Sequence, residues 1–199
     1  FALLVFIAAL PFTFMRHLIA SSQNVYYKKR RLRGAMTPAS LEADSIGART
    51  IKDFTWKQLL DGDACTECGR CSDHCPATAV GRPLSPKMLT IALRDAGYRM
   101  IPLLPSKIDR GGRTPNRPLI GGHASTEVIW SCTTCGACEE ECPLFIEYID
   151  KIVDMRRFLV EQGNMPQTLQ KPMQQIKKKG NAYGGAKGKR AAWTKELED

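Results

Sequence analysis

Apolar side chains recur at helical spacing in several stretches of the chain, and no long stretch shows the alternation typical of a strand. Ser85 and Pro86 suit the start of one such helix, and Gly97 suits its end. In a shorter stretch, Gly62 is the expected end of a helix that leads into the first cysteine. Helices are predicted over residues 54–64, 85–97, 124–132, 144–163 and 167–179. The pattern predicts a mainly α fold.

The first 15 residues carry no charge and precede two tyrosines and a basic cluster. A bilayer-spanning helix needs about 20 apolar residues. We therefore interpret residues 1–24 as the end of a transmembrane helix. Tyr26, Tyr27 and the basic residues between positions 28 and 33 follow in the order expected on the cytoplasmic side of a membrane. The alternative is a buried N-terminal helix followed by a solvated run of charges.

The net charge of +9 is concentrated in two places, residues 28–33 and 177–195. No nucleic-acid-binding motif accompanies either of them, so we expect no nucleic-acid partner. Contact with anionic lipid head groups explains the first cluster more simply. The expected domain order is a membrane segment, a basic juxtamembrane linker, a helical domain, and a weak helix with a basic tail. These cover residues 1–24, 25–53, 54–165 and 166–199.

All eight cysteines lie in two copies of the pattern C-x2-C-x2-C-x3-C-P, at residues 65–76 and 132–143. This is the bacterial ferredoxin spacing, in which the fourth cysteine ligates the other cluster of a two-cluster protein. The pattern predicts two [4Fe–4S] clusters and a reducing compartment. The expected ligands are Cys65, Cys68, Cys71 and Cys142 for the first cluster, and Cys132, Cys135, Cys138 and Cys75 for the second. Zinc is the alternative, although structural zinc sites usually split their ligands into two distant pairs.

The runs FTWKQLLDGDACTECGRCSDHCPA, GRPLSPKMLTIALRD and VIWSCTTCGACEEECP resemble the ferredoxin-like domain of membrane-bound, heterodisulfide-reductase-related iron–sulfur oxidoreductases. The resemblance covers roughly residues 1–165. It implies an alpha-helical two-cluster domain that follows a membrane domain similar to the nitrate reductase gamma subunit. It also implies electron-transfer flavoprotein as a redox partner and menaquinone as a partner through the membrane part. The family's cysteine-rich CCG modules are not in this chain, so no catalytic residue is assigned.

His17 lies near the end of the first apolar stretch. In the gamma-subunit-like family a histidine at a similar position ligates haem b, so the resemblance implies this role for His17. The alternative is a histidine that meets the lipid head groups. The expected function is an electron relay on the cytoplasmic face of the inner membrane, as part of an oxidoreductase. The alternative function is a self-contained ferredoxin-like carrier with a membrane anchor.

Overall fold

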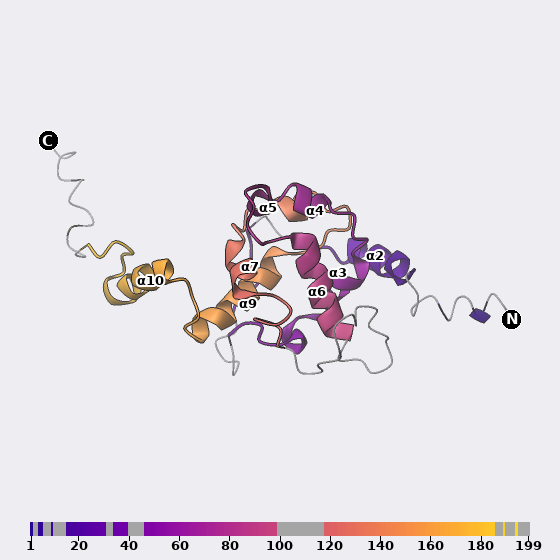
Figure 1. Ribbon diagram of the computed structural model, residues 1–199, viewed down its shortest axis with the longest axis horizontal. Helices are drawn as coiled ribbons and strands as arrows, with labels where there is room; N and C mark the ends of the chain where they lie inside the picture. The colour runs from indigo at the N-terminus through magenta and orange to yellow at the C-terminus, as the bar shows by residue number, and fades with distance from the viewer. Residues whose placement is uncertain are drawn as a thin grey trace. The chain divides into compact units, whose positions relative to one another are not determined.

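The structure is a computed structural model that describes residues 1, 4–5, 9, 15–30, 34–39, 46–98, 118–185, 189 and 194. The chain forms two compact units, residues 1–158 and 159–199 (Figure 1). The elements of the described residues are α2 (Arg16–Tyr26), η2 (Ile51–Asp53), α3 (Trp56–Ala64), α4 (Arg70–Asp73), α5 (Pro76–Ala79), α6 (Pro86–Tyr98), α7 (Thr126–Ser131), α8 (Ala137–Glu140), α9 (Ile149–Glu161) and α10 (Gln167–Lys179). Apart from one bridge between Ile120 and Ala124, these residues are helical or irregular, which confirms the mainly α prediction.

The helix before the first motif, α3, begins with a capping box. The Thr55 hydroxyl accepts from the Gln58 amide, and the Gln58 side chain accepts from the Thr55 amide at 2.8 Å. The helix continues through Gly62 to Ala64, so the prediction that Gly62 ends it is wrong. Gly62 instead allows a close approach to α6, because a Cβ there would lie 3.1 Å from Arg94 Cβ. The helix therefore ends directly at Cys65.

Helix α6 packs against α3, η2 and the first motif. It begins at Pro86, and the Ser85 hydroxyl accepts from the Met88 amide at 3.4 Å, as the sequence predicts for a cap. Leu89, Leu93 and Ala96 are buried along one face. These side chains join α6 to the core that supports the first motif.

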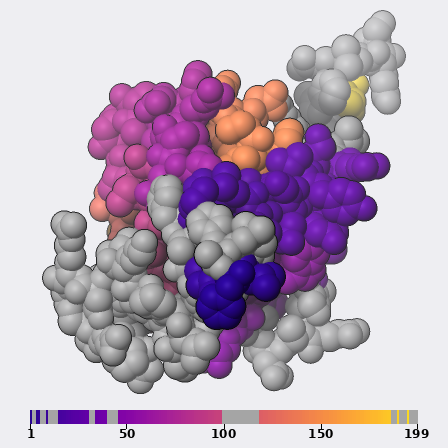
Figure 2. Space-filling view, turned by 90° about the vertical axis from the view of Figure 1, so that its right-hand side faces the viewer, coloured from indigo at the N-terminus to yellow at the C-terminus, as the bar shows by residue number. Residues whose placement is uncertain are grey.

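The N-terminal helix α2 packs against α3. The Ser21 hydroxyl donates to the Ala64 carbonyl at 3.0 Å, and the buried Asn24 amide donates to the Leu144 carbonyl at 2.8 Å. Figure 2 shows the residues of this N-terminal region, in indigo and violet, beside the orange residues around the second motif. No helix within the described ranges is both long and apolar enough to cross a membrane. Much of the expected membrane segment, at residues 2–3, 6–8 and 10–14, lies outside those ranges.

The helix after the second motif, α9, begins at Ile149, five residues later than the predicted position 144. Phe145 adopts a left-handed conformation, with φ of 54°, directly after Pro143 and Leu144, and this turn delays the helix. The Glu139 carboxylate then accepts from the Ile149 amide at 2.8 Å and satisfies one free donor of the first turn.

The second unit contains α10, whose bounds match the predicted residues 167–179. Gly180 ends it in a left-handed conformation, with φ of 67°. Residues 99–117, between α6 and the second motif, lie outside the described part of the chain.

Candidate metal centre

The two cysteine motifs repeat each other in backbone conformation as well as in sequence. Glu67 and Thr134, at equivalent positions, are left-handed with φ of 59° and 55°. Gly69 and Gly136, again equivalent, have φ of 92° and 82° and precede α4 and α8. Glycine adopts this conformation at little cost, whereas Glu67 and Thr134 are strained there. A strained conformation that recurs at matching positions indicates that the motif itself requires this loop shape.

Helices α4 and α8, one from each motif, pack against each other and bring the two motifs together. Cys142, the last cysteine of the second motif, lines a small cavity with three cysteines of the first motif. The four cysteines of this cavity are Cys65, Cys68, Cys71 and Cys142. Of these, Cys68 is exposed and the others are buried. Four thiols that face one cavity are a soft donor set of the kind that iron–sulfur clusters use.

The first motif contributes Cys75 to the neighbourhood of the second. Burial raises the pKa of the Cys132 thiol, and the nearby Cys75 and Cys135 raise it further. Burial also raises the pKa of Cys138, and the nearby Glu139, Cys132, Cys71 and Cys75 raise it further, in that order. Cys75 is buried and caps α5, which begins at Pro76 as the sequence predicts. Cys75 therefore lies near enough to Cys132 and Cys138 of the other motif to affect the pKa of both thiols.

Backbone amides point at the first cysteine of each motif. The Thr134 amide donates to Cys132 Sγ at 3.3 Å, and the Glu67 amide donates to Cys65 in the same way. Such hydrogen bonds stabilise a thiolate and favour the reduced form of a cluster that the thiolate ligates. The residues present therefore fit a pair of iron–sulfur clusters in donor type, burial and hydrogen bonding.

One arginine bonds to the start of each motif, and sequence reasoning missed both arginines. Arg156 donates to the Ile129 carbonyl at 2.8 Å and to the Cys132 carbonyl, and its guanidinium lies 5.1 Å from the Trp130 ring centre. Arg94 donates to the Glu67 carboxylate at 2.8 Å. No sequence signal distinguishes these arginines from others, because their partners are many residues away.

A buried group of ion pairs lies beside the first motif. Asp61, which is fully buried, lies 2.7 Å from both Lys57 and Lys151. Lys57 also lies 3.4 Å from Glu147. Within this group, only the Lys57–Asp61 pair could be recognised from the sequence, because the two residues are four positions apart on one helix. Such a group is costly to bury unless every charge is paired, as it is here.

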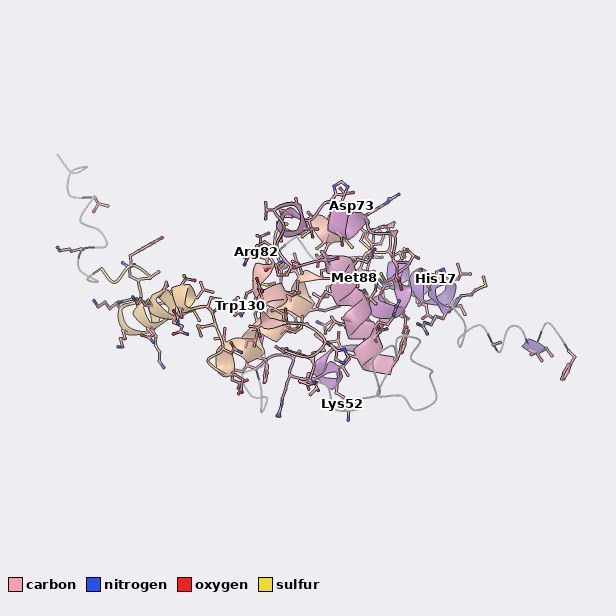
Figure 3. All side chains as sticks on the ribbon, in the orientation of Figure 1. His17, Lys52, Asp73, Arg82, Met88 and Trp130 are labelled. Atoms are coloured by element: carbon pink, nitrogen blue, oxygen red, sulfur yellow. The ribbon has the colours of Figure 1, made fainter. Side chains whose placement is uncertain are left out.

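His17, the expected haem ligand, is half-buried on α2, a helix that carries none of the cysteines (Figure 3). Its role in haem binding stays a prediction. Tyr148 was not singled out by sequence reasoning, yet its buried hydroxyl hydrogen-bonds to Cys71. Burial, followed by this hydrogen bond, raises the pKa of Tyr148.

Residues 64–146 match the family model of the 4Fe–4S dicluster domain. This match decides between the two metals considered above in favour of iron–sulfur clusters. Its boundaries enclose both motifs and the 56 residues between Cys75 and Cys132.

Curated relatives match almost the whole chain. The probable iron–sulfur-binding oxidoreductase FadF of Bacillus subtilis is 35% identical, over 99% of this chain and 32% of its own length. The EtfAB:quinone oxidoreductase of Syntrophomonas wolfei is 36% identical, over 96% of this chain and 29% of its own. A probable membrane-anchored ferredoxin of Chromohalobacter salexigens is 38% identical, over 79% of this chain and 25% of its own.

The chain thus spans about a third or less of the length of these relatives. One subunit of the CoB–CoM heterodisulfide reductases also matches, over 53% of this chain in the protein of Methanosarcina mazei. The chain is therefore a 4Fe–4S dicluster protein, related to FadF, EtfAB:quinone oxidoreductase, membrane-anchored ferredoxin and this heterodisulfide reductase subunit.

Proposed function

We propose that the chain is a membrane-associated electron relay with two [4Fe–4S] clusters, part of a heterodisulfide-reductase-like oxidoreductase. It would connect a soluble donor, such as electron-transfer flavoprotein, to haem or menaquinone in the membrane. The observation that carries the proposal is the closeness of the two cysteine groups. Cys138 of the second group packs against the buried cluster of side chains that contains Cys65, Cys71 and Cys142 of the first. This arrangement suits transfer of electrons from one group to the other.

We further propose that the ligands are crossed between the motifs. Cys65, Cys68 and Cys71 would hold one cluster with Cys142, and Cys132, Cys135 and Cys138 would hold the other with Cys75. The cavity that all four cysteines of the first set line supports this assignment. The contribution of Cys75 to the pKa of Cys132 and Cys138 also supports it. When bound, each cluster supplies one-electron redox chemistry. With four thiolates per cluster, every iron has a protein ligand, and bond-making chemistry is left to other domains or subunits.

The protein's own residues shape the environment of this chemistry. Burial raises the pKa of the Cys65 and Cys132 thiols, and the positive charges of Arg94 and Arg156 offset part of this rise. The hydroxyl of Tyr148 bonds to Cys71 inside the core. Positive charge and hydrogen bonds near the sulfurs favour the reduced form of a cluster.

The N-terminal residues and the names of the relatives support the part of the proposal that concerns the membrane. The names of two relatives mention a quinone and a membrane anchor. We propose that the cluster domain faces the cytoplasm, with residues 1–24 as the end of a membrane helix whose last residues, in α2, bond to the cluster domain through Ser21 and Asn24. We also propose His17 as a haem b ligand. The second candidate function, a self-contained carrier with a membrane anchor, is favoured by the name of the membrane-anchored ferredoxin alone.

The test of the relay is kinetic. The clusters of the full-length protein are reduced anaerobically, a menaquinone analogue is added, and reoxidation is followed with intact Cys71 and with Cys71→Ser. We expect quinone-dependent reoxidation to fall to background in Cys71→Ser and to be unchanged in His74→Gln, a control at an exposed position in the same motif. Full turnover after loss of the cluster would mean that the clusters only support the fold.

A further inference from the structure

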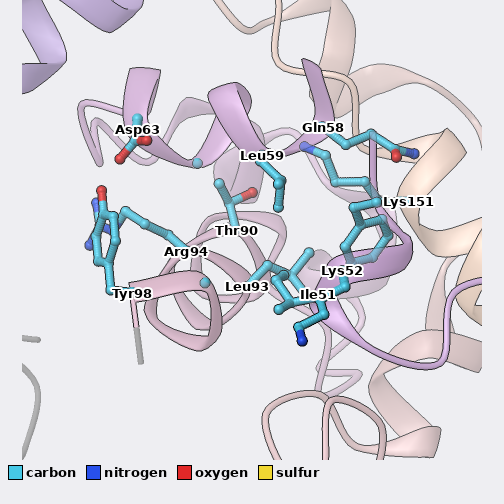
Figure 4. A pocket seen from close by; sticks show the side chains of 13 residues that line it. Ile51, Lys52, Gln58, Leu59, Asp63, Thr90, Leu93, Arg94, Tyr98 and Lys151 are labelled. Atoms are coloured by element: carbon cyan, nitrogen blue, oxygen red, sulfur yellow. The ribbon is translucent and has the colours of Figure 1, made fainter. Parts of the chain in front are cut away.

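A mostly apolar cavity of about 250 Å³ lies between η2, α3 and α6, apart from the cysteine motifs. Its walls include the apolar side chains of Ile51, Phe54, Leu59 and Leu93 (Figure 4). An engineered apolar cavity of about 150 Å³ is large enough to bind benzene. The cavity described here therefore has room for a larger ring system.

One end of this cavity holds three polar groups with unmet hydrogen-bonding capacity. Asp63, Arg94 and Tyr98 lie together there, and the Tyr98 hydroxyl points toward Asp63 (Figure 4). Among the residues that the structure describes, the Tyr98 hydroxyl, Arg94 Nε and Asp63 Oδ1 are buried without a hydrogen-bond partner. Tyr98 is only 8% exposed, so solvent has little access to its side chain.

The neighbouring charges do not satisfy these atoms. Arg94 Nε lies 3.7 Å from Asp95 Oδ1, and Asp63 Oδ1 lies 3.6 Å from Arg16 Nε, both beyond hydrogen-bonding distance. Buried polar groups in native proteins nearly always have a partner, which can be a protein group, an ordered water, an ion or a bound molecule. The missing partner must accept from Arg94 and Tyr98 and lie against an apolar surface.

We propose that this cavity binds the head of a quinone, whose carbonyl oxygen accepts from Arg94 and Tyr98. The inference rests on the proposed function and deepens it by naming a quinone-binding site within the cluster domain. The apolar walls suit the uncharged ring, and the two donors suit its carbonyl. A hydroquinone would also fit, because its hydroxyl can donate to Asp63. A fatty-acid carboxylate fits less well, because it would meet the carboxylate of Asp63.

The cavity adjoins both the first cysteine motif and α2, as a quinone that exchanges electrons with the clusters requires. Arg94 extends from the cavity to the first motif, where it donates to the Glu67 carboxylate at 2.8 Å. Its positive charge opposes the rise that burial causes in the pKa of Cys65. On the other side, the Arg16 guanidinium of α2 lies 4.2 Å from the centre of the Tyr98 ring. The cavity thus lies between the first cysteine motif and the N-terminal helix.

The test is a binding measurement on the cluster-containing full chain in its oxidised state, with 2-methyl-1,4-naphthoquinone as the probe. Equilibrium dialysis gives the dissociation constant. We expect saturable binding by the wild type. Tyr98→Phe keeps the ring beside Arg16 but removes one hydrogen bond of about 1 kcal/mol, which should weaken binding roughly fivefold. Tyr183→Phe makes the same chemical change at a position that is 97% exposed, and it should leave binding unchanged.

A second variant places an apolar side chain in the cavity. Gly97 lines it, and a Cβ at this position would lie 3.8 Å from Ile51 Cγ1, an ordinary contact. Gly97→Leu should fill part of the cavity and abolish saturable binding, and circular dichroism checks that the variant is folded. Wild-type protein without saturable binding, or unchanged binding in folded Gly97→Leu, would overturn the proposal. Tighter binding of decanoate that displaces the quinone would identify an acyl site instead.

The same samples separate this inference from the relay. Electron paramagnetic resonance reports whether both clusters form and accept electrons, independently of quinone binding. Absence of binding with two reducible clusters refutes the quinone site alone. Failure of the clusters to form refutes the relay, whatever the cavity binds.

Discussion

The Nζ atom of Lys29 lies 2.6 Å from Oε2 of Glu147, a residue that follows the second cysteine motif. Lys29 also pairs with Asp150, and its backbone amide donates to Glu147 at 3.3 Å. These contacts tie the basic segment after α2 to the part of the chain that carries Cys142. The basic segment therefore does more than attract lipid head groups, which is the role that its composition predicts.

Replacement of Lys29 by Met should destabilise the protein. The change leaves the buried carboxylates of Glu147 and Asp150 without their common partner, and such a loss costs about 1–3 kcal/mol. Urea unfolding of the cluster-containing protein measures the effect. Arg30→Met removes the same charge at the next, exposed position and should cost less than about 0.5 kcal/mol. Equal costs for the two variants would contradict a specific role for Lys29.

The contribution of Lys29 should also depend on pH in a defined direction. Burial alone would lower its pKa, but the hydrogen bonds to Asp150 and Glu147 outweigh burial, so the pKa is raised above 10.5. A raised pKa means that the folded state binds the proton more tightly than the unfolded state. The stability difference between wild type and Lys29→Met should therefore stay constant between about pH 6, where the carboxyl groups are ionised, and about pH 10, and it should shrink as the pH rises further. A difference that grows in this range would contradict the assigned ion pairs.

Cys142→Ser should damage the cluster held by the other motif. Because Cys142 lines the cavity of Cys65, Cys68 and Cys71, its loss removes one of their four ligands. Iron analysis and electron paramagnetic resonance should show loss or conversion of this first cluster, while the cluster of Cys132, Cys135 and Cys138 remains. Cys138→Ser is the matched change four residues earlier, and it should have the reverse effect. If both variants damage the same cluster, the ligands are not crossed.

Arg156→Met should weaken the site of the second cluster. It removes hydrogen bonds to the carbonyls of Ile129 and Cys132 and leaves these partly buried acceptors unpaired, at a cost of about 1 kcal/mol each. We expect faster loss of the second cluster in air, measured by absorbance decay near 400 nm and by spin counting. The control is Arg157→Met, because Arg157 instead pairs with Asp154 and donates to Thr37. A second cluster that survives equally long in both variants would rule out this role for Arg156.

Tyr148→Phe should lower the reduction potential of the first cluster and leave that of the second unchanged. The change removes the hydroxyl that bonds to Cys71 and keeps the buried ring. A hydrogen bond to a ligand sulfur favours the reduced cluster, and one of about 1 kcal/mol corresponds to roughly 40 mV for a single electron. Redox titration monitored by electron paramagnetic resonance measures both clusters in one sample. Equal shifts in both would indicate a general loosening of the fold.

Local features of the sequence determined most helices and the donor set. Ser85 and Pro86 mark the start of α6, and the predicted bounds of α10 agree with the structure. Such signals can be recognised without tertiary structure, because capping and helical periodicity act within a few residues. The spacing of the cysteines likewise specified an iron–sulfur protein, because it encodes a short loop that presents several sulfurs together.

Tertiary structure decided the features that depend on residues far apart in the chain. Gly62 continues a helix that it was expected to end, because the helix gains close packing against Arg94. Helix α9 starts late because Phe145 turns the chain and Glu139 caps the first free amide. Lys29 and Glu147, Asn24 and Leu144, and the three unpaired polar groups of the cavity meet only after the helices pack. The sequence by itself thus determined which helices form and which atoms can hold a cluster. Packing decided which charges are paired and which polar groups are left for a ligand, because burial gives these interactions their energy.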